Sequence, residues 1–483
     1  MKLQSRRAFI ERSILLALGL LFLPYCKKNS GPGPGPQLGE KKDIIIIGGG
    51  IAGLAAANAL ANSIHNVTIL EASNRYGGRI NTYDFGGYKA DLGASWIHGI
   101  TGNPLYKLAN KNGIVTKVTH YEPSHIYDID GTEITEAEWK KIEKLFNDLY
   151  DLAVKNPQNS LQGLLDIMAP NLNLSSRLTR LWYGAMRSEY EIPYAIDPKD
   201  LAAKAITLND SFPGNDVVFS KGMHSLCQVL AKGVNIEYNS FVSKIDYSDS
   251  KVQVYVNKAD TIDPQRSCNT CHNNSDAVFI KEDKILTADQ VIVALPLGIL
   301  KNKIIDFKPA LPTSKTNAID GLGIGTMNKV FLKFSTNFWD DKAYFFEYLK
   351  TDSLKIIEFF SPAPTGERNV LVAVLAGKHA RSMEQKSDAE VKDMVMSDLK
   401  GMFGNSIPQP ISMHRTAWHT NVFSLGSYPH LLPGSDISVC DEIKKPLSNK
   451  VFFAGDSTSR KYLATAHGAY LSGVDAANKI LGR

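Results

Sequence analysis

The sequence DIIIIGGGIAGLAAANALANSIHNVTILE, residues 43–71, decides the fold of this chain. Its opening run, Asp43–Ile47, is short, apolar and β-branched, which is typical of a strand buried on both faces. The next run, Ile51–Ala61, is rich in alanine and leucine and predicts a helix. A further short run, Val67–Leu70, predicts a second strand that ends at Glu71. The stretch therefore predicts a strand, a helix and a strand in succession.

Three glycines between the first strand and the helix fit the pattern G-x-G-x-x-G. Gly48 permits a tight turn, Gly50 lets the backbone approach a pyrophosphate, and Gly53 lets the helix pack close to the strand. The helix start offers unpaired N–H groups and a positive dipole end to phosphates. Glu71 can accept hydrogen bonds from ribose hydroxyls and would repel a 2′-phosphate. These features predict a dinucleotide site, and a glycine-rich turn in an ordinary strand–helix–strand unit is the alternative.

The composition is that of a globular protein, with 43% hydrophobic and 21% charged residues among 483. This length suggests two or more domains, because single cores seldom grow beyond about 250–300 residues. The formal net charge is +5, but the first 25 residues hold four basic residues and one acidic residue, and without them the charge is +2. The basic residues are scattered as on a solvated surface, and no nucleic-acid partner is expected.

Residues 1–26 predict an export signal, because a positive start precedes about ten apolar residues, too few for a membrane span. Ser5-Arg6-Arg7 resembles the bacterial twin-arginine signal, which would place the protein in the periplasm or on the cell envelope. A general secretory signal with a chance arginine pair is the alternative. Cys26 resembles a lipidated cysteine that would anchor the chain to a membrane, although Pro24-Tyr25 departs from the small residues usual before it. Residues 27–42 contain GPGPGP and predict a linker.

Two motifs follow the predicted second strand. In RYGGR, residues 75–79, the glycines let the backbone pass close to a cofactor, and Arg79 can pair with its pyrophosphate. The sequence DLGASWIHG, residues 91–99, comes next and is followed by Gly102-Asn103-Pro104. Together and in this order, the motifs resemble the FAD-dependent amine oxidases, and the W-I-H-G and G-N-P pieces are most similar to the polyamine oxidase branch. Monoamine oxidases and the histone lysine demethylase share that fold.

The resemblance covers nearly all of residues 43–483 and implies an α/β fold. It implies a Rossmann-like FAD-binding domain in three segments, 43–99, 220–300 and 415–483, and an inserted α+β substrate-binding domain formed by 100–219 and 301–414. The implied cofactor is FAD. Besides the three motif glycines and Glu71, the residues implied to bind it are Ile51, Ala52, Ala72, Gly78, Arg79, Gly93, Ala94, Ser95, Trp96, Val242, Gly455, Asp456, Thr465 and Ala466.

Three residues are implied to act in catalysis. Lys329, in GIGTMNKV, matches the family lysine that holds a water against the reactive flavin nitrogen. Its place in an apolar strand would desolvate it and lower its pKa, and an edge-strand lysine pointing to solvent is the alternative. His98 would face the substrate, with a hydrogen-bonded loop histidine as the alternative. Tyr428 matches the aromatic residue beside the flavin ring.

Two positions bear on the flavin and the substrate pocket. Ser427 stands where monoamine oxidases carry the cysteine that binds flavin covalently, so noncovalent FAD is implied. Thr465 stands where polyamine and monoamine oxidases usually place a second aromatic wall, and it resembles the demethylase there. A substrate bulkier than a simple amine is therefore left open.

Two stretches could carry other chemistry. Glu189 and Glu191 could meet a cationic amine through charge, and surface acids near a core aromatic are the favoured alternative. An irregular polar insert is expected over 257–284, and its Cys268-Asn269-Thr270-Cys271-His272 fits the c-type haem attachment motif. A single copy without an obvious second ligand favours a surface disulfide instead. No metal site is expected.

The implied function is oxidation of an amine to an imine, which water hydrolyses to an aldehyde plus an amine or ammonia, with dioxygen reduced to hydrogen peroxide. The expected partners are thus a small-molecule amine and dioxygen, and the oligomeric state is left open. An L-amino-acid oxidase or tryptophan monooxygenase is a rival, but those relatives carry an arginine where this chain has Trp96. A carotenoid-desaturase-like enzyme would not need Lys329. A surface flavoprotein without turnover, or a haem-linked electron carrier, is the alternative from another class.

Overall fold

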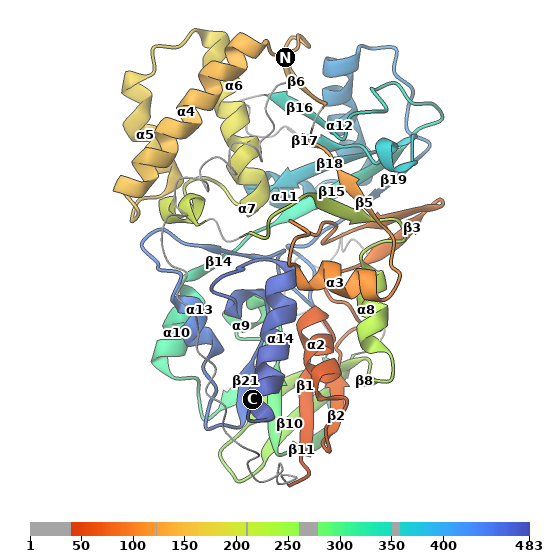
Figure 1. Ribbon diagram of the computed structural model, residues 1–483, viewed down its shortest axis with the longest axis vertical. Coiled ribbons are helices and arrows are strands. Elements are labelled where there is room, and N and C mark those ends of the chain that lie inside the picture. The colour runs from red at the N-terminus through yellow and green to blue at the C-terminus, as the bar shows by residue number, and fades with distance from the viewer. Residues whose placement is uncertain (1–39, 122, 209–210, 260–278, 350–357) are drawn as a thin grey trace, which may run out of the picture.

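The computed structural model describes residues 40–121, 123–208, 211–259, 279–349 and 358–483. The predicted export signal, Cys26, most of the linker and the motif at 268–272 lie outside these residues. Within the described ranges, no helix combines the length and apolarity needed to cross a membrane. Figure 1 shows two lobes along the long axis. The lower lobe lies around β1 (Asp43–Ile47), and the upper lobe lies around β15 (Met327–Lys333) and β18 (Val370–Ala376).

A five-stranded parallel sheet forms the centre of the lower lobe, in the order β21-β12-β1-β2-β8. Ile44 and Ile46 of β1 belong to one hydrophobic core and Ile45 and Ile47 to another, so the strand is buried on both faces as predicted. The strands are β1 (Asp43–Ile47), β2 (Asn66–Leu70), β8 (Asn235–Glu237), β12 (Gln290–Val293) and β21 (Val451–Phe453). Three distant parts of the chain thus supply one sheet.

Helices α2 (Ile51–Leu60) and α14 (Ala466–Ile480) lie side by side on this sheet (Figure 1). They cross closely, since a Cβ on Gly473 would lie 2.0 Å from the backbone oxygen of Ala52. Both helices begin at the same end of the parallel sheet, where the glycine turn lies. Other helices of this lobe are α8 (His224–Ala231), α9 (Leu297–Lys301), α10 (Thr313–Asp320) and α13 (Val439–Lys444).

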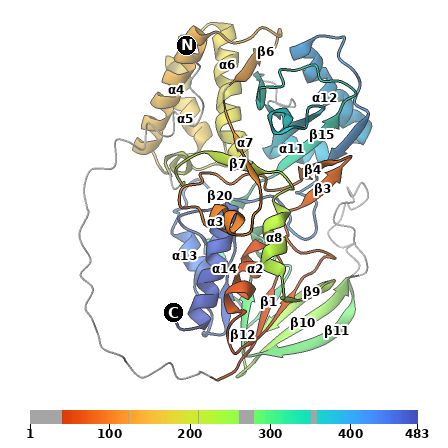
Figure 2. The same ribbon diagram turned by 45° about the vertical axis from the view of Figure 1, so that its right-hand side comes forward.

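A second sheet of the lower lobe corrects two sequence expectations. Its order is β11-β10-β9-β13, with β9 (Ser240–Asp246), β10 (Val252–Ala259), β11 (Phe279–Ala288) and β13 (Asp306–Lys308); Figure 2 shows its long hairpin. β10 and β11 pair as far as Ala259 and Phe279, so the expected irregular insert over 257–284 starts later and ends earlier than predicted. β13 pairs with β9, so this sheet extends past the boundary predicted at residue 300.

A six-stranded sheet forms the upper lobe, in the order β19-β15-β18-β17-β16-β6. On one face, Leu332 and Phe346 belong to the same hydrophobic core as Val395 of α12, and the opposite face turns towards the lower lobe. The strands are β6 (Ser124–Asp128), β15 (Met327–Lys333), β16 (Phe345–Leu349), β17 (Glu358–Phe360), β18 (Val370–Ala376) and β19 (Ser412–Arg415). The helices of this lobe are α4 (Glu136–Lys155), α5 (Leu161–Met168), α6 (Ser176–Met186), α11 (Gly377–Glu384) and α12 (Asp388–Phe403).

Short elements join the lobes. β7 pairs with β5 and bridges to Ile97, and the hairpin of β3 and β4 packs against the lower face of the upper sheet. α7 follows a π-helical turn, Arg187–Glu191. These elements are β3 (Thr82–Phe85), β4 (Tyr88–Asp91), α3 (Pro104–Lys111), β5 (Thr116–Thr119), α7 (Ile192–Tyr194), β7 (Asp216–Phe219), β14 (Leu322–Ile324) and β20 (Pro429–Leu431).

Candidate active site

A cavity of about 570 Å³ runs from the glycine turn of the lower lobe to β15 and β17 of the upper lobe. Every predicted site residue except Gly53 lines it. These residues are Gly48, Gly50, Ile51, Ala52, Glu71, Ala72, Gly78, Arg79, Gly93, Ala94, Ser95, Trp96, His98, Val242, Lys329, Tyr428, Gly455, Asp456, Thr465 and Ala466. Residues from both lobes and from distant parts of the chain therefore meet around one space.

The glycine turn fits a dinucleotide. Gly48 has a φ of +103°, and a Cβ there would lie 2.5 Å from the oxygen of Ala294, so only glycine suits the turn. Gly50 has no atom within 4 Å of the place where its Cβ would be, which leaves the cavity open for a phosphate. Gly50 also caps α2 without a side chain, so the first N–H groups of the helix stay available to an anion.

Glu71 stands at the end of β2, where a ribose would be bound. Its Oε2 accepts a hydrogen bond from the N–H of Gly49 at 2.7 Å, and its Oε1 accepts from the N–H and the hydroxyl of Ser73. The buried carboxylate thus holds the glycine turn in place through Gly49 and also lines the cavity. A carboxylate accepts more bonds than these three, so hydroxyl groups of a ribose can still be bound.

Arg79, the residue predicted to pair with the pyrophosphate, contacts the C-terminal part of the chain. Its guanidinium donates two parallel hydrogen bonds to Asp456, at 2.7 and 2.8 Å, and a third to the backbone oxygen of Ser427. This pair joins the N-terminal motif to the C-terminal part of the same site. Arg75 donates to the backbone oxygen of Gly78 at 2.9 Å, and its buried Nε has no hydrogen-bond partner among the described residues.

Lys329 lies in β15 between β18 and β19, so the edge-strand alternative is wrong. Its side chain is buried, and Nζ donates to the backbone oxygens of Asp91 and Gly93 at 2.9 and 2.7 Å and to the hydroxyl of Ser95 at 2.6 Å. Burial lowers the pKa of Lys329 to about 8, and the nearby charge of Asp91 opposes this shift. A charged Nζ would use all three N–H groups on the protein, whereas the neutral amine has a lone pair that can accept from a water.

Aromatic side chains form the walls beside Lys329. The hydroxyl of Tyr428 donates to the backbone oxygen of Pro193 at 2.9 Å, which fixes that ring. Trp96 packs edge-on against Phe360, and its buried indole N–H has no hydrogen-bond partner among the described residues. The hydroxyl of Thr465 is used to begin α14: it accepts from the N–H of Gly468 and donates to the oxygen of Tyr462. Thr465 therefore caps α14 and does not supply a second aromatic wall.

Sequence reasoning missed several residues of the cavity, among them the acidic residue Glu358. Glu358 is 7% exposed and lines the cavity from β17. The pairing register aligns Lys329 with Val374 and Val374 with Glu358, so both charged side chains project from the same face of the upper sheet. No sequence motif marks this strand, and the direction of its side chains depends on the register with β18. Other lining residues that were missed include Tyr121, Phe345, Trp418 and His467.

The two acids considered for amine binding lie elsewhere. Neither Glu189 nor Glu191 lines the cavity, so the predicted amine contact is wrong for this site. Glu191 is also not a surface acid, since it is buried and pairs with Arg187 at 2.9 and 3.2 Å. Burial raises the pKa of Glu191, and Arg187 opposes the shift.

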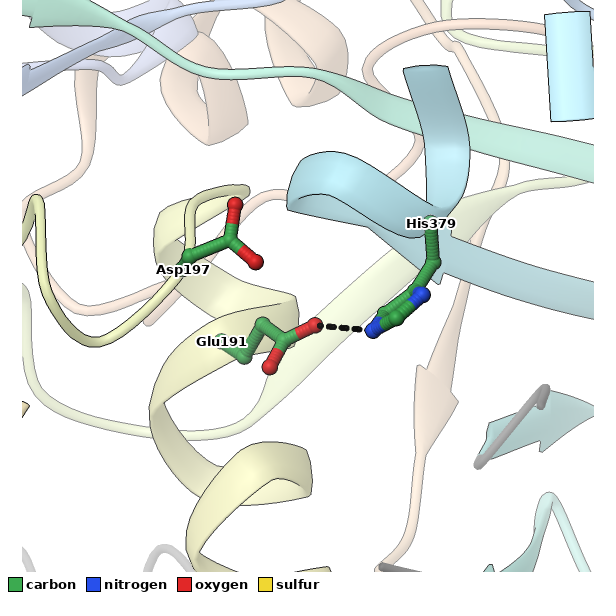
Figure 3. A group of neighbouring side chains, drawn as sticks. All are labelled: Glu191, Asp197 and His379. Carbon is green, nitrogen blue, oxygen red and sulfur yellow. Dashed lines mark ion pairs between the residues drawn. The ribbon is translucent and has the colours of Figure 1, made fainter. Parts of the chain in front are cut away.

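Glu191, Asp197 and His379 form a buried group whose potential ligand atoms lie within 4.8 Å of one another (Figure 3). Nε2 of His379 is 3.7 Å from Glu191, and Asp197 accepts from Arg381 at 3.1 Å. Arg187 and Arg381 already balance the two carboxylates, so a cation would add unpaired positive charge. We therefore interpret the group as an ion-pair network that ties the segments on either side of α7 to α11.

Two glycine variants should separate folding from cofactor binding. A Cβ on Gly53 would lie 2.0 Å from the backbone oxygen of Gly48, so Gly53→Ala should lower stability by about 1–3 kcal/mol. Gly50→Ala meets no protein atom and should keep its melting temperature, but it should weaken FAD binding at least tenfold, about 1.4 kcal/mol. Thermal unfolding and FAD titration by flavin fluorescence would check both. Wild-type FAD affinity in Gly50→Ala would contradict the predicted phosphate position.

Comparisons with known proteins identify one family. The family model described as flavin containing amine oxidoreductase matches residues 51–481. The chain is 31% identical to Lysine-specific histone demethylase 1 homolog 2 of Arabidopsis thaliana over 95% of this chain, and it spans 60% of that relative's length. It is 30% identical to probable polyamine oxidase 4 of the same plant, over 93% of this chain and 91% of that protein.

Solved structures show the same fold. A structure of wild-type putrescine oxidase bound to putrescine superposes with a TM-score of 0.72 at 19% identity, over 92% of this chain and all of that chain. A redesigned double mutant of putrescine oxidase gives the same TM-score at 20% identity. The predicted α/β fold is thereby confirmed. The family match over most of the chain shows that this protein belongs to the flavin-containing amine oxidoreductases and is an amine oxidase that uses FAD.

Proposed function

We propose that the enzyme oxidises a small amine that carries a second positive charge, such as a diamine or polyamine. The product would be an imine that water hydrolyses to an aldehyde and an amine or ammonia, with dioxygen reduced to hydrogen peroxide. FAD, bound noncovalently, supplies the acceptor for the two electrons and the hydrogen removed from the substrate. The observation that carries the proposal is the buried carboxylate of Glu358 in the cavity wall.

The charges of the cavity favour a cationic substrate. Glu358 places a negative charge on the upper wall, beside Tyr428, whose pKa is raised mainly by burial and further by this carboxylate. Trp96 and Phe345 also line the cavity, and aromatic rings attract cations. Of the two arginines that line the cavity, Arg79 pairs with Asp456, and the two terminal nitrogens of Arg75 donate to backbone oxygens.

These contacts disfavour the main rival. An L-amino-acid oxidase or tryptophan monooxygenase needs an arginine that is available to pair with the substrate carboxylate. Among the described residues that line the cavity, the only arginines are the two engaged ones. The names of the polyamine oxidase and putrescine oxidase relatives support an amine without a carboxylate.

The test is anaerobic mixing of the purified enzyme with single amines while the absorption band of oxidised flavin is recorded. Putrescine, spermidine, spermine, acetylated polyamines, aromatic monoamines and L-tryptophan would be compared. Bleaching by diamines or polyamines at least tenfold faster than by monoamines of similar length is expected. Bleaching by L-tryptophan alone would overturn the proposal in favour of the amino-acid oxidase.

We further propose that the enzyme is exported, because Ser5-Arg6-Arg7 precedes an apolar run. The lipid anchor at Cys26 is part of this proposal. Replacing both arginines with lysine should leave the enzyme inside the cell, and Cys26→Ala should release exported enzyme from the membrane fraction. Fractionation followed by immunodetection checks both expectations, and wild-type distribution of both variants would contradict them.

A further inference from the structure

The carboxylate of Asp216 lies behind His98 in the cavity wall. Its Oδ2 is 3.0 Å from Nδ1 of His98 and accepts a hydrogen bond from the hydroxyl of Tyr121 at 2.8 Å. Its Oδ1 accepts from the N–H of Gly99 at 2.8 Å. Asp216 is 3% exposed, whereas the side chain of His98 is 56% exposed and lines the cavity together with Tyr121. One buried carboxylate therefore holds two cavity side chains at once.

The backbone keeps this arrangement in register. β7 begins at Asp216, and Val217 exchanges two hydrogen bonds with Ile97, at 2.9 and 3.1 Å. This bridge fixes the segment that carries His98 against the strand that carries Asp216. Tyr121 is held in turn by stacking on Phe345, with ring centroids 5.3 Å apart and planes 3° apart. Both partners of the carboxylate are thus positioned before any substrate is bound.

This contact determines which nitrogen of His98 carries the proton. A carboxylate accepts hydrogen bonds and donates none when ionised, so Nδ1 of His98 must be the protonated nitrogen. In the neutral ring, Nε2 is then an acceptor on the side away from Asp216. A neutral acceptor in the cavity suits an amine oxidase, because amines arrive as ammonium ions and an ammonium nitrogen has no lone pair to release.

We propose that Asp216 is a positioning residue for this oxidation, holding His98 so that Nε2 accepts the proton of the substrate's ammonium group. In that step the N–H bond of the substrate breaks, an Nε2–H bond forms, and the substrate nitrogen keeps the electron pair. The imidazolium that results lies 3.0 Å from the Asp216 carboxylate, which stabilises it. The inference rests on the proposed function, since it assigns a proton acceptor to amine oxidation.

The other titratable groups around His98 do not compete for this role. The hydroxyl of Tyr121 donates a hydrogen bond to Asp216. His467 also lines the cavity, but burial, with a smaller contribution from His98, lowers its pKa to about 4 and keeps it neutral. Lys329 has three protein acceptors around Nζ. His98 is therefore the side chain that is exposed to the cavity and also contacts a buried carboxylate, that of Asp216.

The test combines Asp216→Asn with a measurement of the His98 ring. An asparagine keeps the size of the side chain and can donate to Nδ1, which would move the ring proton to Nε2 and remove the acceptor. ¹⁵N spectra of the FAD-bound enzyme, with His98→Gln to assign the signal, should show Nδ1–H in the wild type and Nε2–H in the variant. The rate of flavin reduction by the amine should fall at least tenfold in Asp216→Asn.

Two comparisons separate positioning from general destabilisation. The double variant His98→Gln with Asp216→Asn should reduce flavin within twofold of His98→Gln alone, because Asp216 acts through His98. Asp128→Asn is the matched control, a buried aspartate of β6 that pairs with Arg177 and Arg180 and does not line the cavity. It should lower the melting temperature and leave both the His98 spectrum and the reduction rate unchanged.

Either of two results would overturn the inference: a wild-type His98 that carries its proton on Nε2, or an Asp216→Asn enzyme that reduces flavin within twofold of wild type. If Asp216→Asn fails to retain FAD, the wild-type spectrum still decides the first point. If no amine bleaches the wild-type flavin, the proposed function fails, and the spectra separately test the contact of Asp216 with His98.

Discussion

Lys329→Met is expected to retain FAD and to slow flavin reduction or reoxidation at least tenfold, a loss of about 1.4 kcal/mol or more. Met fills the space of the lysine stem but offers no N–H group to Ser95 or to the backbone oxygens of Asp91 and Gly93. Any water that Nζ orients in the cavity loses its partner at the same time. Anaerobic reduction and separate reoxidation with dioxygen measure the two half-reactions, and wild-type rates in both would remove Lys329 from the reaction.

The same variant should change the pH dependence. Since burial lowers the pKa of Lys329 to about 8, Nζ is an ammonium below that pH and a neutral amine above it. The charged form donates its three N–H groups to protein oxygens and has no lone pair. Only the neutral form can therefore accept a hydrogen bond from a water. The half-reaction that depends on Lys329 should therefore accelerate as the pH rises through 8. This inflection should be absent from Lys329→Met.

Lys315 provides a matched control for both experiments. It is also buried, its Nζ donates to three backbone oxygens at the end of α13, and burial lowers its pKa to about 8. It does not line the cavity. Lys315→Met should lower the melting temperature but leave both half-reactions and their pH dependence within twofold of wild type. Slow reduction in Lys315→Met would show that losing any buried lysine perturbs the flavin site.

The sequence predicted the parts of the site that local patterns encode. The first strand is Asp43–Ile47 as expected, and the helix predicted over residues 51–61 is found over Ile51–Leu60, because the residues that favour each element lie within its own segment. The glycine turn was likewise readable from its G-x-G-x-x-G spacing, although the atom that a Cβ on Gly48 would meet, the oxygen of Ala294, lies far along the chain. The cofactor half of the cavity follows from these local features and the resemblance.

Contacts between distant parts of the chain could not be predicted from the sequence. Arg79 could be placed near a phosphate by its motif, but its partner Asp456 lies 377 residues away. Glu358 sits in the short run Glu-Phe-Phe, where period-two alternation does not reveal which side chain faces the cavity. The loop before Asp216 has no recognisable sequence pattern. The role of Asp216 arises from its contacts with His98 and Tyr121, which lie on other segments. Strand register and contacts between distant segments determine where these side chains lie, and neither is encoded in a local stretch of sequence.

Glu358→Gln should reduce kcat/KM for a diamine by about 10- to 100-fold, because a hydrogen bond between charged groups contributes about 1.5–3 kcal/mol. Gln keeps the shape of the side chain and its place in β17 but removes the negative charge from the cavity wall. A monoamine of the same chain length has no second ammonium to lose a partner, so its kcat/KM should stay within twofold of wild type. The ratio of the two values measures the contribution of Glu358 to substrate choice.

Glu347 is the matched control for Glu358. It is paired directly opposite Glu358 on the neighbouring strand and is similarly buried, but it does not line the cavity. Glu347→Gln should leave the ratio of diamine to monoamine turnover unchanged. Equal losses for both amines in Glu358→Gln would mean that the carboxylate supports the fold of β17 rather than binding the distal ammonium. A loss confined to the diamine, absent from Glu347→Gln, would identify Glu358 as the residue that selects a doubly charged substrate.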